Sequence, residues 1–171
     1  MGLNAKKTEY DLREILVSEA TQASLLEETC FLKEEACDLE MIEDRIGKAQ
    51  DMFLVAVEKE SNQLIGMLTG IATNEEKFKD EFFYDASLHR KEGKNVMLLG
   101  LEVLPQYQGQ GIAKDLMDTY LKNMKARNKE KAYLTCHDTL IPLYEKMGFI
   151  NLGLSASSWG GSQWYDMVYY L

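Results

Sequence analysis

The chain has 171 residues, 46% of them apolar and only two of them proline, so it can bury the core of one compact domain spanning residues 1–171. Its 19 Lys and Arg residues against 28 Asp and Glu residues give a formal net charge of −9, which argues against a nucleic-acid partner and mildly favours a cationic one. No apolar run approaches the roughly 20 residues that span a bilayer, and the first residues lack the apolar core of a signal peptide, so we expect a cytoplasmic protein.

The first half of the chain predicts strands and helices in a mixed order. Residues 10–17 (YDLREILV) favour a strand, and helical spacing follows at 23–31 and 39–46. Two apolar runs are joined by a polar turn of hairpin length at 59–63, which predicts an antiparallel pair over residues 52–58 and 64–72. The charged stretch 74–92 contains several apolar side chains and is therefore expected to be a helix or an ordered excursion.

The central stretch, residues 96–117, changes its pattern from strand to helix. Residues 96–104 are apolar except for Gly100 and Glu102 and are bounded by Pro105, which is typical of a buried central strand. From Ile112 onward the apolar residues recur at helical spacing. The glycine turn between the two elements leaves backbone N–H groups unpaired at the start of a helix, and such a turn binds anions.

The last third predicts a short strand at 132–136, a helix at 139–147 that ends at Gly148, and two strands near 149–155 and 164–170. The complete order favours the α/β class, with a mixed sheet of six to seven strands and helices on both faces. The strands that end at Leu104 and Cys136 are linked through a helix, so a right-handed crossover should make them parallel. The glycine turn then lies at the carboxyl end of a strand, where open α/β sheets bind ligands.

The glycine turn does not match common nucleotide-binding motifs. The Walker spacing is absent, and Lys114 stands where G-x-G-x-x-G requires its third glycine. The residues present, Gln108-x-x-Gly111-x-Ala113, resemble the Q/R-x-x-G-x-G/A signature of the GNAT superfamily of acyl-CoA-dependent N-acyltransferases. This resemblance implies acetyl-CoA as cosubstrate, a splay between the two central parallel strands, and a pyrophosphate held by the amides of Gln108, Gly109, Gln110, Gly111, Ile112, Ala113 and Lys114. It further implies that the amides of Leu101 and Val103 pair with the pantetheine arm.

A closer resemblance covers roughly residues 71–171. Residues 136–149 (CHDTLIPLYEKMGF) look like the C-E-D-A-L-V-P-F-Y-E-R-F-G-F segment of arylalkylamine N-acetyltransferases, and residues 74–77, 87–90 and Gly93 are similar to an excursion in that family. The resemblance implies that Tyr144 lies beside the acyl-CoA sulfur. Tyr144 is therefore our candidate for the general acid that protonates the departing thiolate.

The general base is harder to assign from the sequence. Vertebrate members of that family use two histidines on the central strand, and we place Met97 and Leu99 at the matching positions. Glu102 is the only ionisable residue in the strand, and it is our candidate base if a bulge turns it inward. Strict alternation would instead place its side chain on the face opposite to that of Leu99, where it would be a structural carboxylate. His89 and His137 are interpreted as surface or hydrogen-bonding residues, and a chain of water molecules is a further alternative.

The acceptor pocket is expected to include Phe31, Glu35 and Trp159, because aromatic and acidic side chains suit an amine with an apolar body. The same residues have a plainer interpretation as core and rim packing. Cys30, Cys37 and Cys136 show no metal-binding spacing, so no metal is expected, and direct acyl transfer is favoured over a covalent intermediate on Cys136.

We therefore expect an N-acetyltransferase that moves an acetyl group directly from acetyl-CoA to a primary amine, either an arylalkylamine or another small amine. Two alternatives are kept open: an acetyltransferase that acts on a protein or peptide, and a non-catalytic acyl-CoA-binding module. The expected partner is a small-molecule amine, without nucleic acid or membrane, and a homodimer is left open.

Overall fold

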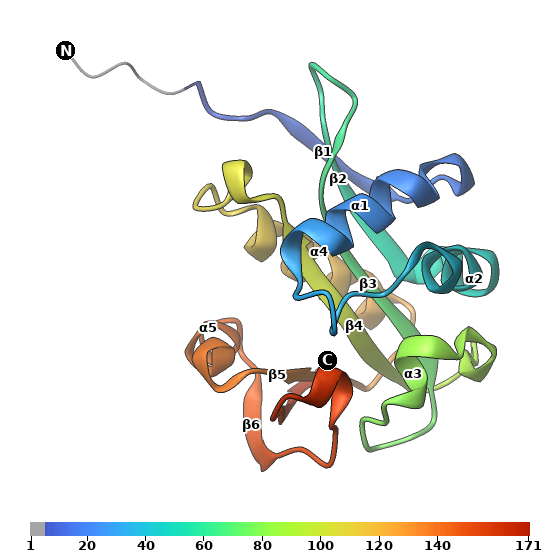
Figure 1. Cartoon of the computed structure of the whole chain (residues 1–171). Helices are drawn as coiled ribbons and strands as arrows, with labels where there is room; N and C mark the ends of the chain where they lie inside the picture. The colour runs from blue at the N-terminus through green and yellow to red at the C-terminus, as the bar shows by residue number, and fades with distance from the viewer. Residues whose placement is uncertain (1–5) are drawn as a thin grey trace.

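A computed structural model describes residues 6–171, and within this range seven strands form one mixed sheet in the order β1-β2-β3-β4-β5-β7-β6 (Figure 1). The sheet confirms the predicted class, the antiparallel β2–β3 pair and the parallel β4–β5 pair. The strands are β1 (Tyr10–Glu14), β2 (Phe53–Glu58), β3 (Leu64–Thr73), β4 (Asn95–Val103), β5 (Lys131–Cys136), β6 (Ile150–Leu154) and β7 (Tyr165–Tyr170).

The helices cover both faces of the sheet, as predicted. Apolar side chains of α1 and α2 pack in one buried cluster, and those of α4 pack in another cluster on the opposite face (Figure 1). Within residues 6–171 no helix is long and apolar enough to cross a membrane. The helices are α1 (Ala20–Cys30), α2 (Leu39–Ala49), α3 (Glu81–Tyr84), α4 (Ile112–Ala126) and α5 (Ile141–Lys146).

Local hydrogen bonds explain where several elements begin and end. The first strand stops at Glu14, short of the predicted residue 17, because the Glu19 carboxylate accepts the Leu16 N–H at 2.9 Å and stabilises a 3₁₀ turn. Asp38 caps α2 by accepting the Met41 N–H at 2.9 Å. The predicted helix at 139–147 starts as a 3₁₀ turn and becomes α-helical at Ile141, one residue before Pro142, which is tolerated in a first turn because it lacks an N–H group.

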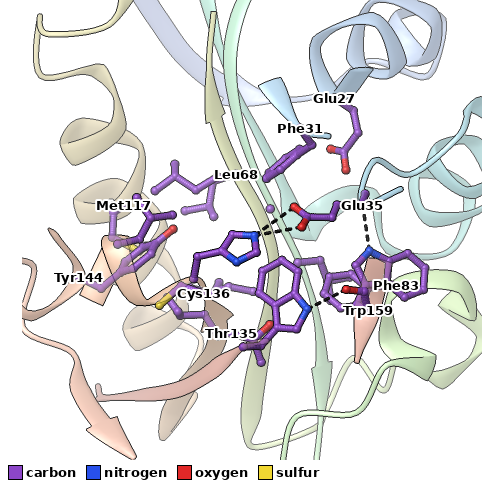
Figure 2. A pocket seen from close by; sticks show the side chains of 18 residues that line it. Glu27, Phe31, Glu35, Leu68, Phe83, Met117, Thr135, Cys136, Tyr144 and Trp159 are labelled. Carbon is purple, nitrogen blue, oxygen red and sulfur yellow. Dashed lines mark hydrogen bonds and ion pairs between the residues drawn. The ribbon is translucent and has the colours of Figure 1, made fainter. Parts of the chain in front are cut away.

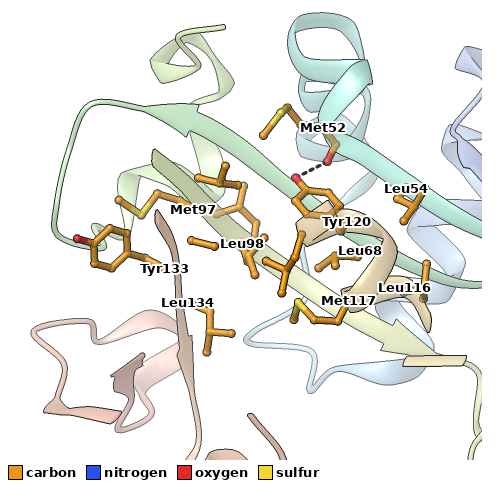
Figure 3. Close-up of a cluster of buried hydrophobic side chains, with 14 of the residues drawn as sticks. Met52, Leu54, Leu68, Met97, Leu98, Leu116, Met117, Tyr120, Tyr133 and Leu134 are labelled. Carbon is orange, nitrogen blue, oxygen red and sulfur yellow. Dashed lines mark hydrogen bonds between the residues drawn. The ribbon is translucent and has the colours of Figure 1, made fainter. Parts of the chain in front are cut away.

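The core beneath α4 fixes the central strand. Tyr120 of α4 is 2% exposed, and its hydroxyl donates to the Met52 carbonyl oxygen at 2.9 Å, so its polar end is satisfied inside the core (Figure 3). Met97 and Leu98 of β4 pack in the same cluster with Leu68 of β3. Each such buried side chain contributes about 1.5–3 kcal/mol, so β4 is held firmly along its apolar length.

The central strands β4 and β5 separate partway along their length. They pair only at Asn95↔Lys131, Val96↔Ala132 and Met97↔Tyr133, and beyond this point β5 pairs with β7 alone. The β3–β4 register shifts between Thr69↔Gly100 and Gly70↔Leu98, which makes Leu99 the extra residue of a β-bulge. The remainder of β4 therefore has a free edge where β5 has moved away, and the candidate site lies there.

Candidate functional site

A pocket of about 690 Å³, counted with its open mouth, lies between the diverging strands (Figure 2). Its floor comes from β4, β5 and α5, and its walls come from α1, the α1–α2 loop and the β6–β7 loop. The lining includes two glutamates and several aromatic rings but no Lys or Arg side chain, so the pocket is acidic and aromatic. The lining residues are Glu27, Phe31, Glu35, Leu68, Phe83, Leu98, Leu99, Gly100, Leu101, Met117, Leu134, Thr135, Cys136, His137, Leu140, Tyr144, Trp159 and Trp164.

The free edge of β4 can pair with an extended ligand. The Leu104 N–H donates to the Ile65 carbonyl oxygen of β3 at 2.9 Å, so it points away from β5. Because N–H directions alternate along a strand, the amides of Val103 and Leu101 point to the opposite edge, into the splay. These are the two amides that the family resemblance assigned to the pantetheine arm.

The glycine turn provides a cluster of free amides at the end of β4. Gly111 has φ 85°, a left-handed conformation that favours glycine, and it immediately precedes α4. The amides of Gly109, Gln110 and Gly111 donate no hydrogen bond within residues 6–171. A side chain added at Gly109 or Gly111 would meet no atom within 4 Å, so space is available for an anion. The Gln108 side chain donates to the Val103 carbonyl oxygen at 3.0 Å and ties this turn to β4.

Tyr144 of α5 lines the pocket from the side of β5. Its ring is 8% exposed and packs edge to face against Phe149, with ring centres 5.8 Å apart. Burial, followed by the nearby Cys136 and Glu102 charges, raises the pKa of the Tyr144 hydroxyl. The hydroxyl is therefore protonated at neutral pH and can donate a proton to an atom in the pocket.

Glu102 lies next to the pocket beside a second carboxyl group, that of Glu27. It is 4% exposed and does not itself line the pocket; a Cβ atom added at Gly100, which does, would lie 2.9 Å from Glu102 Oε2. Burial and then the neighbouring Glu27 carboxylate raise the pKa of Glu102 well above its ordinary value. Neither Glu102 oxygen has a hydrogen-bond partner within residues 6–171. Both effects favour the protonated, neutral form of the Glu102 carboxyl group.

Glu27 of α1 is the member of this carboxyl pair that lines the pocket. It is 2% exposed, its Oε1 accepts the Cys37 N–H at 3.1 Å, and its Oε2 has no partner among the described residues. An unpartnered buried carboxylate oxygen at a pocket wall is suited to a cationic ligand.

A closed ring of contacts joins the α1–α2 loop to β5 and the β6–β7 loop. His137 Nε2 lies 3.0 and 3.2 Å from the Glu35 carboxylate oxygens, and the His137 ring stacks on Trp164 with ring centres 4.2 Å apart. Trp164 Nε1 donates to the Trp159 carbonyl oxygen at 2.8 Å, and Trp159 Nε1 donates to the Glu35 carbonyl oxygen at 2.9 Å. Figure 2 shows Glu35 and Trp159 side by side at the pocket wall. The two loops are thereby held together over one side of the pocket.

The pocket brings together Tyr144, Leu101, Phe31, Glu35 and Trp159 from the residues singled out in the sequence, whereas Glu102, Val103 and the glycine turn are not among its lining residues. Sequence reasoning missed Glu27 as a pocket residue and treated His137 as peripheral. His137 could have been found from its place directly after the strand that splays from β4. Glu27 could not, because nothing in the sequence distinguishes it from the neighbouring acidic residue of the same helix.

Cys136 also lines the pocket, but its chemistry is that of a buried thiol. Burial, followed by the Asp138 and Asp166 charges, raises the pKa of Cys136 to about 11, so the thiolate needed for nucleophilic attack is scarce at neutral pH. Within residues 6–171, moreover, no group of three or more His, Cys, Asp or Glu side chains is arranged to hold a metal ion.

Comparison with known proteins finds a matching family model and similar curated proteins. The family model described as "Acetyltransferase (GNAT) family" matches residues 12–149. Serotonin N-acetyltransferase of Mesocricetus auratus is 28% identical over 109 residues, which cover 63% of this chain and 51% of that protein. The chain thus spans about half the length of this curated relative.

Two solved structures share the fold over nearly their full length. The loading GNATL domain of CurA from Lyngbya majuscula has a TM-score of 0.81 and 17% identity, covering 95% of this chain and 98% of that one. The GphF GNAT-like decarboxylase in complex with isobutyryl-CoA has a TM-score of 0.76 and 14% identity, covering 94% and 98%. At these identities the likeness establishes the architecture alone.

Proposed function

The chain belongs to the acetyltransferase (GNAT) family, which is an enzyme family. We propose that it is a single-domain enzyme that transfers an acetyl group from acetyl-CoA to a small primary amine. The body of this amine is apolar and preferably aromatic. The observation that carries this proposal is the composition of the pocket. Carboxyl groups and aromatic rings line it, and no cationic side chain does. Such a lining attracts an ammonium group and accommodates an aryl or alkyl body.

The cofactor half of the proposal rests on the free edge of β4 and the glycine turn. The Leu101 and Val103 amides can pair with the amide groups of pantetheine, and the free amides from Gly109 onward can hold the pyrophosphate at the start of α4. An acetyl group at the end of this arm would enter the splay beside the Leu99 bulge, where a backbone N–H can polarise the thioester carbonyl.

The reaction that fits this arrangement is direct attack of the amine on the thioester. The amine nitrogen bonds to the carbonyl carbon, the carbon–sulfur bond breaks, and Tyr144 donates its proton to the departing thiolate. Glu102 contributes through its neighbour Glu27, whose carboxylate lines the pocket and draws the ammonium group to its reacting end. We keep Glu102 as a proposed residue of the catalytic site that acts through Glu27, because its own carboxyl group is not part of the pocket lining.

A small acceptor is favoured over an extended peptide by the contact between the two loops. The Trp159 Nε1 hydrogen bond to the Glu35 carbonyl oxygen joins the α1–α2 loop to the β6–β7 loop. A chain lying across the pocket would have to break this contact. A carboxylated acyl-CoA, the kind of substrate that a decarboxylase requires, would place an anion beside Glu27 and Glu35, which is electrostatically unfavourable.

The proposal is tested by following thiol release from acetyl-CoA with arylalkylamines, polyamines, amino acids and short peptides. We expect the highest kcat/KM for an arylalkylamine such as 2-phenylethylamine. Turnover on peptides alone would show that the loops open and that the acceptor is a polypeptide. Acetyl-CoA binding without turnover on any acceptor would indicate an acyl-CoA-binding module instead.

The role of Tyr144 is tested in the same assay with Tyr144→Phe. Removal of the hydroxyl should lower kcat by roughly 100-fold or more, the usual contribution of a general acid. The dissociation constant for acetyl-CoA, measured by calorimetry, should stay within about twofold, because the ring and its packing on Phe149 remain. An unchanged kcat would rule out the assigned role.

A further inference from the structure

We infer that His137 is the general base that takes the proton from the acceptor amine, and that Glu35 is the residue that positions its imidazole ring. The inference rests on the acetyl transfer proposed above. It fills a gap in that mechanism, since a primary amine is an ammonium ion near neutral pH and must lose a proton before or during attack on the thioester.

His137 stands at the right place along the fold. It directly follows β5, the strand that leaves β4 to open the splay, and it lines the same pocket as Tyr144 and the β4 residues around the bulge. Histidine is the side chain most often used as a general base near neutral pH. The family segment that this region resembles has glutamate at the matching position, so the histidine is a feature of this chain.

The Glu35 contact selects the tautomer of the ring. Both Glu35 oxygens accept from the same ring nitrogen, Nε2, at 3.0 and 3.2 Å. In the neutral ring Nε2 then carries the hydrogen, and the lone pair is on Nδ1. Nδ1 has no hydrogen-bond partner within residues 6–171, so it is available to a donor in the pocket.

Glu35 is itself held in place, as a positioning group must be. Its side chain is 5% exposed, and its Oε1 also accepts the Ser162 hydroxyl at 2.8 Å. The backbone of Gly160 packs so closely that an added Cβ atom would lie 2.6 Å from Glu35 Cγ. The Trp164 ring covers one face of the imidazole at an interplanar angle of 26°. The Glu35 contact and the stacking on Trp164 together fix the orientation of the His137 ring.

A base must release its proton after every turnover, and this requirement separates His137 from the carboxyl pair. The His137 side chain is 34% exposed, so the proton taken up at Nδ1 can leave through water. Glu27 and Glu102 are 2% and 4% exposed, and a proton accepted there has no comparable route. We assign the holding of the ammonium group to the carboxyl pair and its deprotonation to His137.

The proton balance is complete with these two groups. The bound ammonium ion first passes one proton to His137 Nδ1, and the imidazolium ion, stabilised by the Glu35 carboxylate, releases this proton to solvent. The neutral amine then attacks: as the carbon–nitrogen bond forms, a second N–H proton passes to His137 Nδ1, the carbon–sulfur bond breaks, and Tyr144 protonates the thiolate of CoA. His137 again releases its proton to solvent and Tyr144 regains one, so the sum is ammonium ion plus acetyl-CoA giving amide, CoA thiol and one proton.

The test compares two acceptors of nearly equal shape, 2-phenylethylamine, which is protonated at neutral pH, and O-benzylhydroxylamine, which is not. His137→Gln keeps a donor that can bond Glu35 but cannot accept the proton. We expect its kcat/KM to fall about 100-fold or more for 2-phenylethylamine and less than about 10-fold for O-benzylhydroxylamine. Exogenous imidazole should partly restore the activity of His137→Ala on 2-phenylethylamine.

Glu35→Gln tests the positioning role. It should lower kcat less than His137→Gln does, leave the dissociation constant for acetyl-CoA unchanged, and add little to the defect when the two substitutions are combined, because both act through one ring. The control is Asp138→Asn, a conservative change at the neighbouring exposed residue, which should retain wild-type rates. Thermal unfolding of each variant monitors folding.

Equal losses of His137→Gln on both acceptors, without imidazole rescue, would overturn the inference and make His137 a packing or recognition residue. Wild-type rates in His137→Gln would overturn it as well. Both results leave the proposed acetyl transfer standing, because they require an active wild-type enzyme. Absence of wild-type turnover on both acceptors would instead overturn the proposed small-amine function, and this inference with it.

Discussion

Glu102 is a buried carboxyl group whose ionisation lowers the stability of the fold. Burial comes first and the Glu27 carboxylate second among the causes that raise the pKa of Glu102. A carboxyl group with a folded-state pKa above its unfolded value binds its proton more tightly in the native state. Stability therefore falls as the pH rises from the unfolded pKa toward the folded one, and the penalty is complete above the folded pKa.

Glu102→Gln should remove this penalty and stabilise the protein. The glutamine carries no charge and offers an N–H donor to the unpartnered Glu27 Oε2. We expect a gain of about 1–3 kcal/mol in the free energy of unfolding at pH 8, the size of an unsatisfied buried polar group, and a smaller gain at pH 5. Urea denaturation at both pH values measures it. The KM for the amine should stay within about twofold in the same variant, because the Glu27 carboxylate that lines the pocket is retained, and a loss of stability at pH 8 would contradict the account of the pair.

The junction of β4 with α4 shows how a short element can be built for binding. Tyr120 and Leu116 anchor α4 in the core, while the turn that precedes the helix exposes its amides. Two left-handed glycines, Gly109 with φ 78° and Gly111 with φ 85°, connect β4 to the first turn of α4. If this turn holds the cofactor as proposed, binding and conformation depend on the same backbone, and a change in one should appear in the other.

Gly111→Ala should weaken acetyl-CoA binding with little effect on kcat at saturating cofactor. A Cβ atom in the left-handed region costs about 1–2 kcal/mol, so we expect a comparable loss of stability and a higher KM for acetyl-CoA. Gly47→Ala is the matched control, because Gly47 lies in α2 with an ordinary φ and open space around it. That substitution should stabilise α2 by about 0.5–1 kcal/mol and leave the KM unchanged. Equal KM values in both variants would exclude the turn as the cofactor site.

The charge of the whole molecule should act in opposite directions on the two proposed substrates. The net charge of −9 attracts a cationic amine and repels acetyl-CoA, whose phosphates are anionic. In the proposed function, close contacts in the pocket and at the glycine turn therefore have to hold the cofactor against a repulsive long-range field.

Added salt should separate these two effects. Screening weakens both long-range interactions as the Debye length shortens from roughly 30 Å at 0.01 M to about 8 Å at 0.15 M ionic strength. Between these conditions we expect the KM for 2-phenylethylamine to rise and the KM for acetyl-CoA to fall, each by about two- to fivefold. Steady-state kinetics across a NaCl series measures both KM values. A KM for the amine that does not change with the NaCl concentration would show that the acidic pocket does not steer the amine.

The arrangement of elements could be predicted because its signals are local. Hydrophobic periodicity placed the strands and the helices α1, α2, α4 and α5 within a few residues, whereas α3 was covered only by the expectation of a helix or an ordered excursion over residues 74–92. The glycine turn was recognisable from Gln108, Gly111 and Ala113 alone. These patterns depend on neighbours in the chain, whose spacing the backbone geometry of strands and helices translates directly into faces and turns. The end of β1 differed from the prediction because the Glu19 carboxylate accepts the Leu16 N–H and stabilises a turn there. Residue propensities do not predict such a side-chain hydrogen bond.

The acceptor side of the site was decided by packing between distant segments. His137 and Glu35 are 102 residues apart, and Glu35 and Trp159 are 124 residues apart, yet they form one network. Sequence alone could name Glu35 and Trp159 as pocket residues, but it could not orient the His137 ring, pair Glu27 with Glu102, or show that Glu102 is left out of the pocket lining. Those outcomes depend on a bulge, a splayed strand and two loops that meet over the sheet, and such long-range geometry leaves no period or motif in the chain.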